Sequence, residues 1–171
     1  MISIKIMRRL ICYFFFGIIS FFLYQNAEYD WDLPGYIGSI LKLENNNDAK
    51  IHQNTYKILN ENTTPVEFST IIGHGKGFRF AQYKNAVFFN SQIQYYEVKR
   101  LYVFLGYALY KLGISLIKAI LFINFLSAFL AACLIFNLLL AIGIKNLLVS
   151  FLITLNIILF PWMAEMKPAD F

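Results

Sequence analysis

Two aspartates follow the first long apolar stretch of the chain, in a segment rich in aromatic residues. Asp32 precedes Pro34 by two positions and Tyr36 by four, a pattern typical of a residue that caps the first turn of a short helix. An ionised carboxylate just outside a membrane helix can also act as a general base at the lipid–water boundary. Two interpretations therefore stay open for Asp32, with Asp30 as the second candidate base: a helix cap beside an aromatic anchor, or a catalytic carboxylate.

A glycine-rich stretch at residues 72–79 carries two cations, Lys76 and Arg79. It is not a P-loop, because the four-residue gap between glycines and the closing Lys-Ser or Lys-Thr pair are missing. One interpretation is a flexible glycine turn, and the other is a loop whose two cations contact a lipid phosphate. His52 and His74 have no second ligand at helical spacing, so we expect polar loop residues there and no metal site.

A third group of candidates lies at residues 92–112, where tyrosines and aliphatic residues surround the Lys99-Arg100 pair. Tyrosines at headgroup level beside apolar side chains are typical of a helix that lies in the membrane interface. In such a helix Arg100 could pair with an anionic headgroup or with a catalytic carboxylate. The alternative is an aromatic belt with no further role.

The composition indicates which elements must position these candidates. Apolar residues make up 58% of the 171-residue chain, aromatic residues make up 18%, and the mean hydropathy is +0.56. Soluble domains contain about 45–50% apolar residues, so the composition indicates an integral membrane protein. The net charge of +5 comes from scattered bases, many beside apolar runs, and this distribution argues against a nucleic-acid partner.

Three apolar runs without charges predict three transmembrane helices. The first follows a cluster of bases and lacks a small-x-small cleavage site, so we expect an uncleaved anchor in preference to a signal peptide. The basic amino end and Lys145 should stay cytoplasmic, which sends every acidic residue to the outer side. We therefore divide the chain into residues 1–27 (cytoplasmic amino end and first span), 28–112 (extracytoplasmic loop) and 113–171 (a hairpin of spans at about 115–142 and 147–164, and the start of the next outer loop).

Helical patterns also occur within the outer loop. We expect a short amphipathic helix at residues 37–43, a second helix at about 49–59, a turn-rich break at 60–65 and a single interfacial helix at 92–112. The predicted fold class is an all-α membrane protein, with three transmembrane helices and a long extracytoplasmic loop that contains amphipathic or interfacial helices.

The order of these features resembles the amino-terminal part of the GT-C superfamily, whose polytopic membrane glycosyltransferases use polyprenyl-phosphate-linked sugars. The resemblance covers essentially the whole chain but only a fraction of the family's usual length, so we expect an amino-terminal portion of such an enzyme or a small relative. The matching pieces are Asp-Trp-Asp-Leu-Pro-Gly-Tyr at 30–36, Lys-Arg-Leu-Tyr at 99–102, Lys-Leu-Gly at 111–113 and Lys-Pro-Ala-Asp at 167–170.

The resemblance implies a base for the acceptor hydroxyl at Asp32 or Asp30, a donor phosphate near Arg100, and further substrate-binding residues at Tyr36 and at Asp170, which follows the third span. The sugar would pass from a lipid-linked donor to a glycan, lipid or protein acceptor, outside a bacterial inner membrane. A cationic group or a divalent metal ion would stabilise the leaving phosphate, although the acidic residues define no metal site. The alternative function is that of a non-catalytic membrane protein, a partner or export component in envelope polysaccharide assembly.

Overall fold

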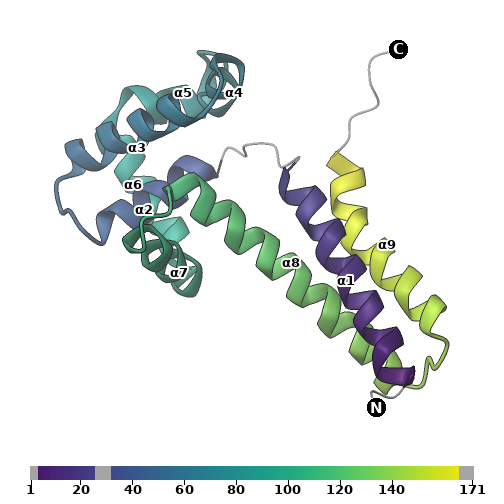
Figure 1. Ribbon diagram of the computed structural model, residues 1–171. Coiled ribbons are helices and arrows are strands. Elements are labelled where there is room, and N and C mark those ends of the chain that lie inside the picture. The colour runs from purple at the N-terminus through teal and green to yellow at the C-terminus, as the bar shows by residue number, and fades with distance from the viewer. Residues whose placement is uncertain (1–3, 26–31, 166–171) are drawn as a thin grey trace, which may run out of the picture. The chain divides into compact units, whose positions relative to one another are not determined.

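The computed structural model describes residues 4–25 and 32–165 (Figure 1). Helices account for most of these residues, and no strand lies in the two described ranges, which confirms the all-helical prediction. The chain divides into two compact units, residues 1–26 with 124–171 (unit 1) and residues 27–123 (unit 2). The helices are α1 (Ile4–Gln25), α2 (Leu33–Lys42), α3 (Asp48–Asn62), α4 (Pro65–Ile71), α5 (Gly77–Lys84), α6 (Ala86–Glu97), α7 (Arg100–Lys111), α8 (Leu116–Ala141) and α9 (Leu147–Glu165).

Unit 1 contains α1, α9 and the greater part of α8, which are apolar on nearly all sides. Its small core is aromatic: the Phe16 ring stacks on Phe151 with centroids 5.2 Å apart and meets Phe136 edge-on at 5.5 Å. Many large apolar side chains point outward instead, as Phe14 (67% exposed) and Leu134 (71% exposed) do. Such a surface suits lipid better than water.

Two of the described helices are long and apolar enough to cross a membrane, at Ile6–Tyr24 and Leu116–Ala141. Only 11% of the first apolar window and 28% of the second are buried against the rest of the chain, whereas a core helix of a soluble protein is mostly buried. These helices favour an integral membrane protein. The apolar part of α9, Leu147–Leu159, is shorter within the described side chains, so a third span stays a prediction.

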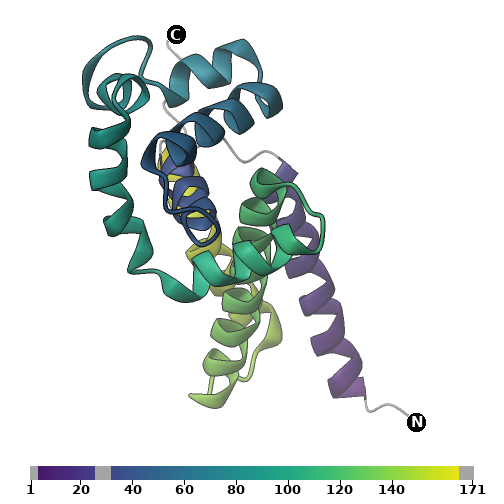
Figure 2. The ribbon, with the colours of Figure 1, turned by 90° about the vertical axis from the view of Figure 1, so that its left-hand side faces the viewer.

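Unit 2 is organised around α2, which lies among α3, α6 and α7 (Figure 2). Every residue from Leu33 to Leu41 is buried. The prediction of an amphipathic helix at 37–43 was therefore wrong in its start. It was also wrong in its polar face as far as Leu41, because α3, α6 and α7 cover this part of α2, and Lys42 at the end of the helix stays half-exposed. Glycine makes this close packing possible: a Cβ at Gly38 would lie 2.8 Å from the Phe89 ring, and one at Gly106 of α7 would lie 2.6 Å from Ile40.

The remaining helices of the loop agree in part with the sequence. The helix predicted at 49–59 is confirmed as α3, which continues to Asn62 and shortens the predicted break. The single helix predicted at 92–112 was wrong, since α6 ends at Glu97 and α7 begins at Arg100. α7 buries Val103 and Gly106 and exposes the apolar side chains of Leu101 and Phe104. An exposed apolar face is typical of a helix on a membrane surface, and that location for α7 stays a prediction.

Candidate functional site

Asp32 occupies the N-cap position of α2, as its spacing from Pro34 predicts. The expected capping bond is absent, however: the backbone of Asp32 is helical, with φ −77° and ψ −19°, and its side chain makes no cap hydrogen bond. The carboxylate instead accepts a hydrogen bond from the Tyr96 hydroxyl on α6, with 3.0 Å between Oη and Oδ1. The Asp32 side chain therefore does not cap α2, because its carboxylate binds the hydroxyl of Tyr96, 64 residues further along the chain.

Gly35 lets the Tyr96 ring reach this position. A Cβ at Gly35 would lie only 2.3 Å from the ring, so any larger residue in the first turn of α2 would displace it. Tyr96 then meets Tyr36 edge-on, with ring centroids 5.1 Å apart, and Tyr36 packs on Tyr102 of α7 at 4.7 Å. The result is a tyrosine cluster at the start of α2, with the Asp32 carboxylate at its edge.

Lys99 brings a positive charge to the same cluster. It lies in the short connection between α6 and α7, where its ammonium group donates a hydrogen bond to the Tyr36 hydroxyl. The ammonium is also 5.0 Å from the centroid of the Tyr36 ring. The hydrogen bond to Tyr36, and to a smaller extent the negative charge of Asp32, raise the pKa of Lys99 above its usual value. Lys99 is therefore cationic at neutral pH, beside a carboxylate.

The cluster combines groups that serve in acid–base chemistry and in anion binding. The Tyr96 hydrogen bond occupies Oδ1 of Asp32, and Oδ2 is the oxygen with which this carboxylate could take a proton from a hydroxyl. The exposed ammonium of Lys99 could hold a phosphate that departs or binds nearby. Tyr36 is 8% exposed, so it positions Lys99 from within the core.

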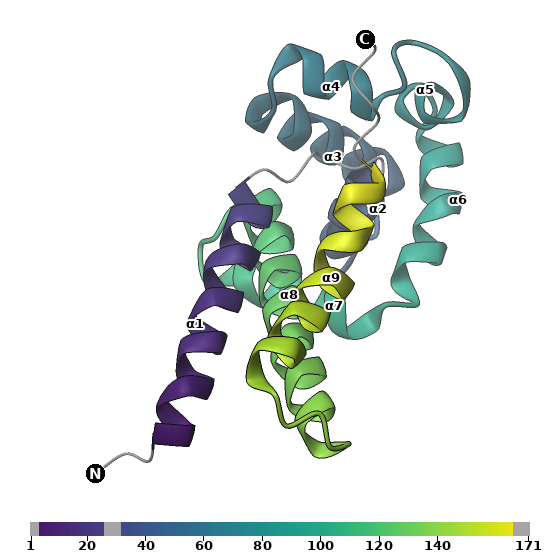
Figure 3. The same cartoon turned by 90° about the vertical axis from the view of Figure 1, so that its right-hand side faces the viewer.

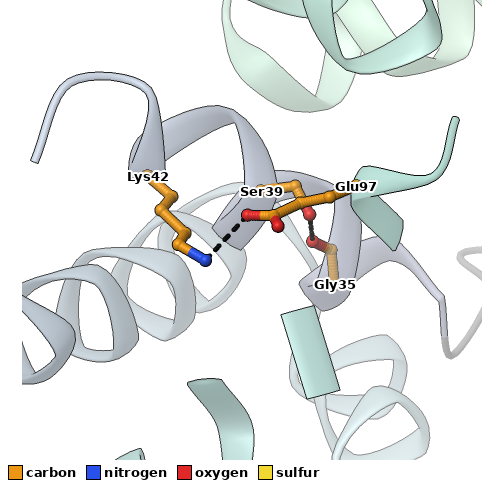
Figure 4. A network of polar contacts seen from close by, with 4 residues as sticks. All are labelled: Gly35, Ser39, Lys42 and Glu97. Carbon is orange, nitrogen blue, oxygen red and sulfur yellow. Dashed lines mark hydrogen bonds and ion pairs between the residues drawn. The ribbon is translucent and has the colours of Figure 1, made fainter. Parts of the chain in front are cut away.

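Arg100 lies next to a groove of about 510 Å³ at the α6–α7 corner. Apolar side chains such as Phe104 and Val103 form much of its wall. Beside the groove, an ion pair joins Lys42 of α2 to Glu97 of α6, with 2.8 Å between Nζ and Oε1 (Figure 4). Of the Lys99-Arg100 pair, Lys99 is thus the residue with a described bond to the tyrosine cluster, and Arg100 faces the groove.

Lys76 and Arg79 lie elsewhere in unit 2, Lys76 in the connection between α4 and α5 and Arg79 in the first turn of α5. Gly73, His74 and Gly75 all have positive φ there, which confirms the predicted glycine turn. Helix α6 separates this turn from Lys99, and its twelve residues extend over about 18 Å (Figure 3). Arg79 donates a hydrogen bond to the backbone oxygen of Thr70 over 3.3 Å. The structure therefore does not bring Lys76 and Arg79 to the tyrosine cluster.

Two predicted site residues, Asp30 and Asp170, lie outside the described residues. Within the described part of the chain, no three His, Cys, Asp or Glu side chains form a group that could hold a metal ion. His52, expected in a loop, lies in α3 with Nε2 3.0 Å from the backbone oxygen of Gln82, and its ring packs on Phe89.

No protein-family model, curated protein or solved structure matches this chain. The candidate site is therefore defined by the chain's own residues. Two of these, Tyr96 and Lys99, appear in the sequence only as members of the tyrosine-rich segment at 92–112. For Tyr96 the sequence offers one signal, the glycine at position 35, which indicates that another side chain packs closely against α2 but does not identify that side chain.

Proposed function

We propose that this chain is a GT-C-like integral membrane glycosyltransferase, or the amino-terminal portion of one. It transfers a sugar from a polyprenyl-phosphate-linked donor to a glycan, lipid or protein acceptor. Asp32 takes the proton of the acceptor hydroxyl, which attacks the anomeric carbon, and Lys99 neutralises the phosphate that leaves. Arg100, which lines the groove at the α6–α7 corner, contacts a phosphate of the donor, and the apolar wall of this groove contacts the lipid part.

The observation that carries this proposal is that one tyrosine cluster holds both a carboxylate and a cation, each bound to a different tyrosine. Tyr96 orients Asp32, and Tyr36 orients Lys99, although the two partners of each bond are more than sixty residues apart in the chain. A base and a phosphate-binding cation are the two groups that sugar transfer from a lipid phosphate requires. The apolar helices support a lipid-linked substrate, because they favour a location in a membrane.

The proposal is tested by Asp32→Asn in the complete protein, in membranes supplied with polyprenyl-phosphate-linked sugars. Asparagine keeps an oxygen for the Tyr96 hydrogen bond, so the fold persists while the base is lost. We expect sugar transfer to fall by about a hundredfold or more. Asp48→Asn is the matched control, because this exposed carboxylate lies in the first turn of α3, and it should retain activity.

Asp30→Asn tests the second candidate base in the same assay. Full transfer by both the Asp30 and the Asp32 variants would remove the carboxylate mechanism. The mutual pairing of Asp32, Tyr96, Tyr36 and Lys99 also suits a purely structural brace, which is the role expected in a non-catalytic partner of envelope polysaccharide assembly. That alternative predicts co-purification with a larger membrane protein and unchanged transfer in the asparagine variants.

The proposed topology has three spans, α1, α8 and α9, with the loop between α1 and α8 on the extracytoplasmic side of a bacterial inner membrane. Single cysteines at Asn46 and Lys145, in a background without Cys12 and Cys133, should react with impermeant thiol reagents from opposite sides. Reaction of both from the same side would overturn the topology and, with it, the sidedness of the candidate site.

A further inference from the structure

A groove of about 590 Å³ lies in unit 1, between the first turns of α1 and the start of α9. Its walls are apolar, with Ile11 and Phe15 from α1 and Leu148 and Phe151 from α9. The Phe15 and Phe151 rings meet edge-on, with centroids 6.2 Å apart, and hold the two helices together beside the groove. A volume of this size accommodates a substantial part of a small molecule or of a lipid.

Two cations line this groove, Arg8 from α1 and Lys145 from the connection between α8 and α9. The described side chains of unit 1 include no carboxylate, and the ion pairs found in the described residues all lie in unit 2. The charges of Arg8 and Lys145 therefore have no acidic partner among the residues that the structure describes around them. A groove with two such charges is complementary to an anion.

The position of the cations along the helices identifies the kind of anion. Arg8 is the third residue of the apolar stretch that begins at Ile6, and the α8–α9 connection lies at the same end of the bundle (Figure 1). In a membrane, this end of the stretch is at headgroup level, and the apolar walls continue toward the hydrocarbon. The start of α9 adds a partial positive charge at the same place, although Asn146 accepts hydrogen bonds from the N–H groups of Leu148 and Val149.

We infer that this groove binds an anionic phospholipid. Its headgroup phosphate lies between Arg8 and Lys145, and one acyl chain follows the apolar wall formed by Ile11, Phe15 and Leu148. Basic pockets between membrane helices bind anionic lipid headgroups in this way, with electrostatic attraction above and apolar contact below. The inference depends on a membrane location for unit 1 and is independent of the transferase activity proposed for unit 2.

The test uses the full chain, purified and delipidated in a zwitterionic detergent, and native mass spectrometry of bound lipid. Dioleoylphosphatidylglycerol is the anionic probe, and dioleoylphosphatidylcholine is the zwitterionic control with the same acyl chains. Each basic side chain near an anionic lipid strengthens binding about fivefold. The double variant Arg8→Gln/Lys145→Gln should therefore bind phosphatidylglycerol about thirtyfold more weakly, with its weak binding of phosphatidylcholine unchanged.

Arg9→Gln is the matched control, because Arg9 is the next residue of α1, is exposed and does not line the groove. It should bind phosphatidylglycerol as the wild type does. An equal loss in Arg9→Gln would mean that general surface charge attracts the lipid, and unchanged binding in the double variant would exclude the groove; either result overturns the inference. The wild-type preference requires no variant: equal affinity for the two lipids overturns the inference even if the double variant does not fold.

Discussion

The close approach of α2 and α6 at Gly35 makes a sharp prediction about Gly35→Ala. The new Cβ would lie 2.3, 2.4 and 2.5 Å from three carbons of the Tyr96 ring. Ordinary contact begins at 3.4 Å, so the ring must retreat by about 1 Å. The Tyr96–Asp32 hydrogen bond, now 3.0 Å long, cannot survive such a displacement.

The expected cost follows from these changes. Overpacking of a buried site costs about 1–3 kcal/mol, and the loss of a hydrogen bond to a charged, partly buried group adds about 1.5 kcal/mol. The higher helix propensity of alanine returns about 0.5–1 kcal/mol. We therefore expect Gly35→Ala to lower the free energy of unfolding by about 1.5–4 kcal/mol.

A double-mutant cycle with Tyr96→Ala identifies the cause of this loss. Removal of the tyrosine ring takes away the three atoms nearest to a Cβ at position 35, and the propensity of alanine should then make Gly35→Ala stabilising by about 0.5–1 kcal/mol. Equilibrium denaturation of the full chain in detergent, followed by near-ultraviolet circular dichroism of the tyrosine cluster, gives the four free energies. Gly17→Ala is the control, because a Cβ there would meet Phe129 at an ordinary 3.7 Å.

If Gly35→Ala is as stable as the wild type, the Tyr96 ring is free to move and the close approach at Gly35 does not fix its position. Equal destabilisation by Gly35→Ala with and without the Tyr96 ring would also contradict the prediction. In that case the cost would come from the backbone of α2 and would say nothing about the site.

Three further predictions concern other contacts of unit 2. Because its folded-state pKa is raised by Tyr36 and then by Asp32, Lys99 should stabilise the fold fully below its usual pKa of 10.5 and lose this effect as the pH rises further. Lys99→Gln should therefore lower the free energy of unfolding by less than about 1 kcal/mol, because the group is exposed. In denaturation experiments above that pH, this difference from the wild type should shrink. Phe89→Ala should lower the free energy of unfolding by about 3–5 kcal/mol, because Phe89 is 1% exposed in the core; a loss below about 1 kcal/mol would contradict its burial. Thr64→Ala should destabilise α4 by about 1 kcal/mol, visible as faster amide hydrogen exchange in that helix, because Thr64 and Glu67 form a reciprocal cap.

The all-helical class and the two membrane-length helices are properties that the sequence determines by itself. Long runs without charges remain apolar whatever they pack against, and their length alone satisfies the thickness of a bilayer. The position of Asp32 directly before a helix is equally local, since Asp32 and Pro34 have the spacing of an N-cap and a first-turn proline, although the apolar pattern alone placed the start of that helix too late, at residue 37. A glycine turn within residues 72–79 was one of two interpretations of that stretch for the same reason, because glycine adopts positive φ without strain.

The contacts that these residues make depend on how the helices pack. A helical pattern and a cap depend on neighbours within about four residues, whereas Asp32 and Tyr96 meet across 64 residues and Tyr36 and Lys99 across 63. Packing also turned α2 from the expected amphipathic helix into a buried one, since three helices converge on it. Packing also separates the two neighbouring cations at positions 99 and 100. Lys99 binds the tyrosine cluster and Arg100 lines the groove, because the chain changes direction between α6 and α7 and successive side chains there face different surroundings.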